Sequence, residues 1–130
     1  MRKFYLFNLK EEIYNYYYDK PDKLYKVIDG IYNDDWFDKF LFLQLINYNE
    51  DISCYIKSVY YKKCGSIYLL KNKKEKTAVN IKKSVIIITS SVDNPDILIF
   101  LNKLFKYMFV IDFKNSDYFF LNNIKYIYYF

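Results

Sequence analysis

The sequence predicts an α/β protein, with α+β as an alternative, in which helices cover a mixed β-sheet inside one compact domain spanning residues 1–130. Segments with the composition of strands alternate along the chain with segments that repeat apolar residues at helical spacing. The 130 residues are enough to bury a core without a metal or a disulfide. No linker or internal repeat divides them. We therefore expect one folding unit.

The first half of the chain contains one predicted strand, three predicted helices and one ambiguous segment. Residues 3–9 are rich in β-forming side chains and predict a strand. Residues 11–20 predict a short helix that ends before a proline, and Pro21–Tyr32 predicts a second helix because its apolar residues recur at i, i+3, i+4 and i+7. Residues 39–46 fit either a helix or a buried strand, and we favour the strand. Residues 50–61 predict a third helix.

Beyond residue 65 the pattern changes to that of strands. Residues 66–72, 77–84 and 85–91 predict three neighbouring strands. The first two are joined by residues 73–76, KKEK, which we interpret as a solvated turn.

Residues 94–108 predict the clearest helix in the chain, with Asn94 as its cap and Pro95 at the first helical position. Residues 109–113 predict the strand that follows. Together with the preceding strand they form a candidate right-handed parallel crossover. Residues 118–130 are expected either to pack back on the domain or to form an edge strand.

The composition is unusual, with 17 Tyr and 12 Phe but only two Gly, two Pro and no His. Coding by an AT-rich genome explains this bias, so the number of tyrosines is not by itself a functional signal. The net charge of +5 permits an acidic partner. The lysines are scattered and Arg2 is the sole arginine, which weighs against a reader of nucleic-acid bases. A small basic nucleic-acid-binding protein remains the alternative function.

Most catalytic arrangements are excluded by the residues that are missing. Without histidine there is no Ser-His-Asp or Cys-His arrangement, and with glycine only at positions 30 and 65 there is no Gly-rich phosphate-binding loop. Cys54 and Cys64 are too few for a zinc site. We expect no enzyme, no cofactor and no metal. Asp112, in a predicted strand, is the acid that an enzymatic alternative would use.

No secretion signal is visible, because the apolar start of the chain is interrupted at Asn8 and Lys10. The longest apolar runs fall short of the roughly 20 residues that span a bilayer. We expect a cytoplasmic monomer that contacts neither nucleic acid directly nor a membrane.

The helix predicted at residues 11–18 carries more apolar surface than its own docking requires. At 100° per residue its aromatic and aliphatic side chains cover an arc of roughly 200°, whereas a stripe of about 100° is enough to pack on a core. Tyr14 and Tyr18 can pack inward at i, i+4 spacing, which leaves Ile13, Tyr17 and Tyr16 as a second face. That face is either a protein-docking surface or is covered by later parts of the chain.

The two ends of the chain resemble a known family. Residues 4–18, FYLFNLKEEIYNYYY, resemble the N-terminal signature of the sporulation inhibitor of replication (SirA) family: a short strand, then Lys-Glu-Glu, an apolar residue and a tyrosine four positions later. Residues 109–122, FVIDFKNSDYFFLN, are similar to the closing strand of that family. The resemblance covers roughly a third of the chain.

The resemblance implies a small α/β protein without chemistry of its own. It would bind the N-terminal domain of the replication initiator DnaA and prevent new rounds of replication in a cell that commits to sporulation. The family's two central contacts fall on Ile13 and Tyr17, although the first of these positions is aromatic in the family. We add Tyr16, Glu12 and Tyr14 to the expected protein-binding residues.

Overall fold

The computed structural model describes residues 1–34, 39–49 and 62–126. Within these residues, seven strands form one sheet in the order β2-β3-β4-β5-β1-β6-β7, and all neighbouring strands are antiparallel. The strands are β1 (Arg2–Asn8), β2 (Lys62–Cys64), β3 (Ile67–Lys71), β4 (Lys76–Ile81), β5 (Ile86–Ser90), β6 (Met108–Asp112) and β7 (Asp117–Phe120). The helices are α1 (Glu11–Tyr17), α2 (Pro21–Tyr32), α3 (Lys39–Leu45), α5 (Ile97–Leu104) and the 3₁₀ helix η1 (Leu121–Tyr126).

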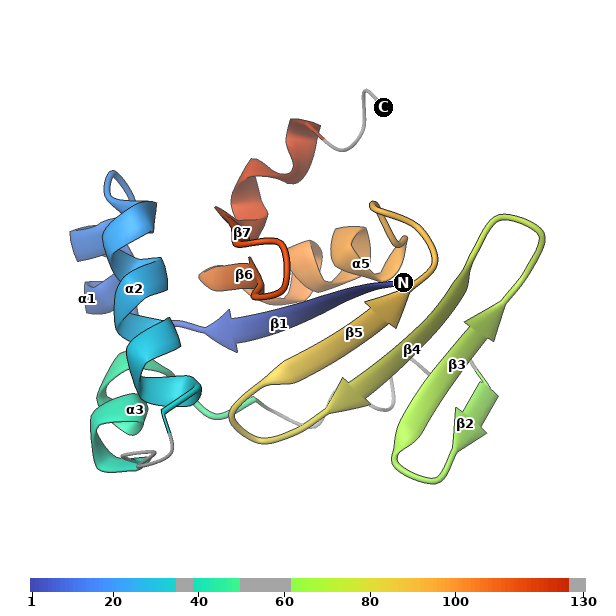
Figure 1. The fold of residues 1–130 in the computed structure, drawn as a ribbon, viewed down its shortest axis with the longest axis horizontal. Helices are drawn as coiled ribbons and strands as arrows, with labels where there is room; N and C mark the ends of the chain where they lie inside the picture. The colour runs from blue at the N-terminus through green and yellow to red at the C-terminus, as the bar shows by residue number, and fades with distance from the viewer. Residues whose placement is uncertain (35–38, 50–61, 127–130) are drawn as a thin grey trace.

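Helices cover both faces of the sheet, as Figure 1 shows, with α5 on one side and α1 to α3 grouped at the end of β1. The alternation of strand side chains creates these two faces. On β1, Phe4 and Leu6 face the α5 core, which also contains Leu98 and Leu101. The next β1 side chain, Phe7, instead joins the core beneath α1 to α3. That second core includes Leu24, Ile28, Phe42, Phe109 and Ile111.

The single α+β domain with helices on a sheet agrees with the predicted fold class, but the pairing is not mixed. Strands β5 and β6 are both antiparallel to β1, which lies between them. They therefore run in the same direction and are connected through α5, as the predicted crossover requires. They are not hydrogen-bonded to each other, because the N-terminal strand occupies the place between them.

Residues 39–46 were predicted as a strand, and this was wrong: Lys39–Leu45 forms α3. Phe42 is fully buried in the core, and Ile46, just after the helix, forms an isolated bridge with Leu9. A short apolar run lacks the periodicity that separates a helix from a buried strand. The predicted helix at residues 50–61 lies outside the described residues, and β2 was not predicted.

The later elements follow the prediction with shifted ends. Asn94 is not the cap of α5, because the helix begins at Ile97 with Asp96 as its N-cap. It ends at Leu104, since Phe105 is extended, and Met108 belongs to β6. The C-terminal segment does both things that were expected of it. It supplies the edge strand β7, and η1 then packs on α5.

Candidate functional site

Helix α1 is a short helix that leaves the sheet immediately after β1. Lys10 is its N-cap and has an extended backbone (φ −65°, ψ 148°) without a side-chain capping bond. Glu11 and Glu12 lie in the first turn, where the helix dipole favours carboxylates. At the other end the Tyr18 N–H donates to the Tyr14 carbonyl (2.9 Å), and the next helix starts at Pro21. None of the residues of α1 is fully buried.

Tyr14 anchors the inner side of α1, as predicted. Its ring lies 4.6 Å from the ring of Tyr107 and 5.2 Å from that of Phe120, measured between centroids. Its hydroxyl accepts a hydrogen bond from Asn122 Nδ2 at 2.6 Å. Tyr107 precedes β6, Phe120 is the last residue of β7 and Asn122 lies in η1. Helix α1 is therefore held in place by residues near the other end of the sequence.

Of the two alternatives for the second face of α1, Ile13 and Tyr17 follow the one in which other parts of the chain cover it. Both are half-buried and pack against the core beneath α1 to α3. The wheel assumed packing from one direction, but α1 contacts α2 in addition to the anchors of Tyr14. A helix that is packed from two directions buries a wider arc of its surface than a helix that packs on a flat sheet.

Tyr16 and Tyr18 are the exposed aromatic side chains of this region, each with 61% of its surface accessible. Tyr18 was predicted to point inward and does not. It is the C-cap, one residue beyond the helix, and its ring stacks outside that of Tyr14 with centroids 6.4 Å apart. We call Tyr16, Tyr18 and the half-exposed Tyr17 the tyrosine patch.

Tyr16 is held in place by its neighbours. Its ring meets Tyr17 edge-on at 4.7 Å between centroids, and Lys20 Nζ lies 4.0 Å from the Tyr16 ring centroid. Lys20 also donates to the Tyr16 carbonyl at 2.7 Å. An exposed aromatic ring fixed in this way loses less freedom when a partner covers it.

The five predicted protein-binding residues thus divide into two groups. Tyr16 and Glu12 are exposed, while Ile13, Tyr14 and Tyr17 are half-buried and hold the helix on the domain. Tyr18 was missed as an exposed contact. The signal that could have found it is the short distance to Pro21, which leaves Tyr18 in the last turn or beyond it.

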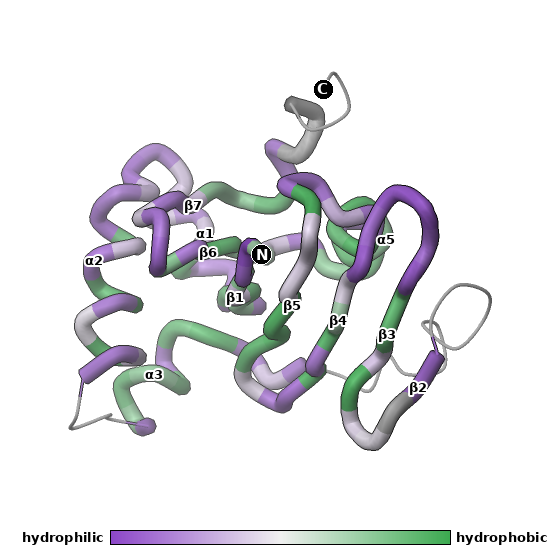
Figure 2. The backbone as a smooth tube through the Cα atoms, turned by 45° about the vertical axis from the view of Figure 1, so that its right-hand side comes forward, coloured by the Kyte–Doolittle hydropathy of each residue, from purple (hydrophilic) through white to green (hydrophobic). Residues whose placement is uncertain are grey.

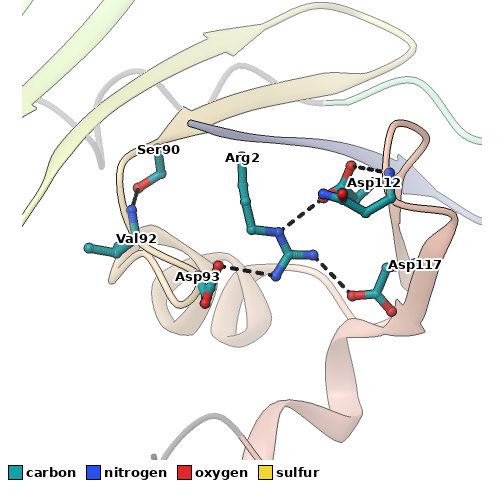
Figure 3. Close-up of polar contacts among 7 residues, drawn as sticks. Arg2, Ser90, Val92, Asp93, Asp112 and Asp117 are labelled. Atoms are coloured by element: carbon teal, nitrogen blue, oxygen red, sulfur yellow. Dashed lines mark hydrogen bonds and ion pairs between the residues drawn. The ribbon is translucent and has the colours of Figure 1, made fainter.

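Asp112, the candidate acid of an enzymatic alternative, is engaged in a buried ion pair. Arg2 Nε lies 3.0 Å from Asp112 Oδ2, Arg2 Nη2 lies 3.0 Å from Asp117 Oδ2, and Arg2 Nη1 lies 3.5 Å from Asp93 Oδ1 (Figure 3). Asp112 is only 2% exposed, and it also accepts hydrogen bonds from the backbone N–H and the side-chain amide of Asn115. This cluster joins β1 to β6, β7 and the loop after β5.

The electrostatics of Asp112 follow from these partners. Burial by itself would raise the pKa of Asp112, but the hydrogen bonds from Asn115 and Arg2 and the charge of Arg2 outweigh it and lower the pKa below its usual range. A carboxylate with a lowered pKa is a weak base at neutral pH. The arrangement therefore suits a structural ion pair.

The described residues contain no group of three or more Cys, Asp or Glu side chains that could hold a metal ion. Within the same residues no helix has the length and apolar content to cross a membrane. No protein-family model matches the chain, and a search of curated proteins finds no match. The resemblance to the SirA family therefore rests on residues 4–18 and 109–122 alone.

Proposed function

We propose that this chain is an inhibitory protein-docking module whose helix α1 binds the N-terminal domain of DnaA. Bound one to one, it would block the contacts by which the initiator assembles at the replication origin of a sporulating cell. The identity of the target comes from the resemblance of residues 4–18 and 109–122 to the SirA family. The observation that carries the docking function is the exposure of two tyrosines, Tyr16 in the last turn of α1 and Tyr18 at its C-cap, 61% each.

Tyrosine is suited to this role because it contributes a large contact area with few rotatable bonds and keeps a polar tip. Such residues are enriched among those that dominate binding energy. A single exposed aromatic residue needs no explanation. Here two exposed tyrosines lie two residues apart in the sequence, and Tyr16 is already held by Lys20 and Tyr17.

The half-buried residues of α1 have a different part in the proposal. Ile13 and Tyr17, the two contacts implied by the resemblance, keep part of their surface open. A partner that covers Tyr16 would also cover the open edge of Tyr17, because the two rings touch. Glu11 and Glu12, exposed in the first turn, would favour basic groups on that partner.

The test is a calorimetric titration of the chain against the isolated N-terminal domain of DnaA from the same organism. We expect saturable one-to-one binding. Tyr16→Ala should weaken it by about 2 kcal/mol, a roughly 30-fold increase in Kd, as for a hot-spot residue. Because Tyr16 is exposed, this variant should retain the fold, whereas Tyr17→Ala would also remove core contacts.

Tyr48→Ala is the matched control, since Tyr48 is a tyrosine with 48% exposure that follows α3 instead of α1. It should leave the affinity unchanged. Equal loss in both variants, or undiminished binding by Tyr16→Ala, would remove α1 as the docking helix. Failure of the unchanged chain to bind would remove DnaA as the target.

A further inference from the structure

The charge of the chain is segregated along the sequence. Residues 62–91 contain eight lysines and one acid, Glu75, and therefore carry +7. Since the whole chain carries +5, all other residues together carry −2. Our interpretation of the lysines as scattered was wrong in this respect. The basic segment corresponds to β2, β3, β4 and β5, which are four neighbouring strands at one end of the strand order.

All eight lysines are exposed, while the single acid is not. Glu75 is 5% exposed and accepts a hydrogen bond from Thr77 Oγ1 at 2.7 Å, so it is not part of the exposed surface. Figure 2 shows the turns on both sides of β4 as strongly hydrophilic. The lysines lie on β2 (Lys62 and Lys63), on the β3–β4 hairpin (Lys71, Lys73, Lys74 and Lys76) and in the β4–β5 turn (Lys82 and Lys83).

The pairing of the strands places several of these lysines on one open face. Lys62 pairs with Leu69, which is 42% exposed, and Lys71 pairs with Lys76. Strand side chains alternate, so Lys71, Leu69 and Ile67 share this face. Among the described residues of β1 to β5, no carboxylate belongs to it. We call this side of β2 to β4, together with its two flanking turns, the lysine face.

Lys71 and Lys76 lie directly opposite each other at the turn end of the β3–β4 hairpin. Like charges directly across an antiparallel pair are destabilising. Lys73 and Lys74 in the turn add to the repulsion within the hairpin. A partner with several negative charges would remove this cost on binding.

We propose that the lysine face binds the phosphate backbone of a nucleic acid without preference for base sequence. Lysine is a point-charge donor that suits phosphate contacts. The one arginine, which could read a base with two hydrogen bonds, is already bound by Asp93, Asp112 and Asp117. Among the described residues, the exposed apolar side chains of the face are Ile67 and Leu69, which are aliphatic and offer no stacking platform.

The length of β4 suits contact with several phosphates of an extended polyanion. Its six residues extend about 20 Å, and lysines flank it at both ends. This length matches the rise of about six base pairs. The proposal uses none of the residues of the tyrosine patch, so it is independent of the docking function.

Fluorescence anisotropy of a labelled 20-base-pair duplex of arbitrary sequence tests the proposal. We expect saturable binding at 50 mM NaCl that falls steeply by 200 mM, with the same affinity for a second duplex of unrelated sequence. Replacing Lys71, Lys73, Lys74 and Lys76 by Gln should weaken binding at least tenfold and reduce the log–log salt slope by about three to four, near one per lost phosphate contact.

The matched control replaces Lys23, Lys26, Lys103 and Lys114 by Gln. These four lysines are also exposed, and they lie outside residues 62–91, so the change in net charge is identical. The control should keep most of the affinity and the slope. Equal losses in the two variants, no binding at 50 mM NaCl, or binding only to vesicles of anionic phospholipid would each overturn the proposal. Circular dichroism of both variants verifies that they are folded.

Discussion

At the residue scale, Arg2 and Asp112 show how one charged pair is stabilised inside a sheet. Asp112 is almost fully buried, and its carboxylate accepts hydrogen bonds from both Arg2 and Asn115. Arg2 remains partly exposed and shares its charge with Asp117 and Asp93, both at the surface. Removing one partner of such a pair is costly because it leaves the other charge without compensation.

The lowered pKa of Asp112 makes this pair sensitive to acid. The folded-state pKa lies below the unfolded value of about 3.9, so the ionised carboxylate stabilises the fold above that pH and the contribution is lost as the pH falls through the folded pKa. Asp112→Asn should cost about 2 kcal/mol in the free energy of unfolding at pH 7 and make the acid dependence shallower. Urea unfolding at pH 7 and pH 3.5 measures both effects.

Asp93→Asn is the control for this prediction. Asp93 faces the same guanidinium at 3.5 Å but is 77% exposed, so water screens its charge. We expect little change in stability or in its pH dependence. If Asp112→Asn behaves like this control, the buried ion pair does not hold β1 against β6.

At the element scale, the two glycines differ: the backbone requires a glycine at one position and only tolerates it at the other. Gly30 lies inside α2, and a Cβ added there meets no atom within 4 Å. Gly65 lies in the turn between β2 and β3 with φ +64°, where a side chain is strained. Gly30→Ala should stabilise the protein by about 0.5–1 kcal/mol, whereas Gly65→Ala should destabilise it by about 1 kcal/mol. Thermal unfolding of the two variants compares the signs directly, and the same sign in both would contradict the different roles of the two glycines.

Local patterns predicted most elements but not their partners. The apolar spacing of Pro21–Tyr32 and the β-forming residues of β1 are local properties, and both elements were predicted. The position of β1 between β5 and β6 depends on contacts between residues some 80 to 110 positions apart in the chain. Hydrophobic periodicity is a local pattern and does not reveal such contacts. The same limit applies to α1. The helical wheel indicated that Tyr14 packs inward, but it could not show that contacts from other parts of the chain half-bury Ile13 and Tyr17.

At the scale of the whole molecule, the two proposed surfaces lie at different ends of the domain. The tyrosine patch lies at the C-terminal end of α1, which is anchored by Tyr107, just before β6, and by Phe120, the last residue of β7. The lysine face lies on β2 to β4, on the other side of β5 and β1 in the strand order. In Figure 1, α1 and the β3–β4 hairpin stand at opposite ends of the long axis of the molecule. The sheet therefore separates a surface with the exposed carboxylates Glu11 and Glu12 from one whose exposed charged groups are lysines.

This separation predicts that the two ligands bind independently. Effects at sites that share no contacts usually add, so saturating the chain with the 20-base-pair duplex should change its Kd for the N-terminal domain of DnaA by less than about twofold. Calorimetric titration of that domain with and without the duplex measures the coupling, and a titration of the domain into duplex alone corrects for contacts between the two ligands. Tyr16→Ala should weaken only the binding of the DnaA domain. The replacement of Lys71, Lys73, Lys74 and Lys76 should weaken only the binding of the duplex. Mutual exclusion would mean that the ligands share a surface, and the segregation of charge along the sheet would then not divide the functions of the molecule.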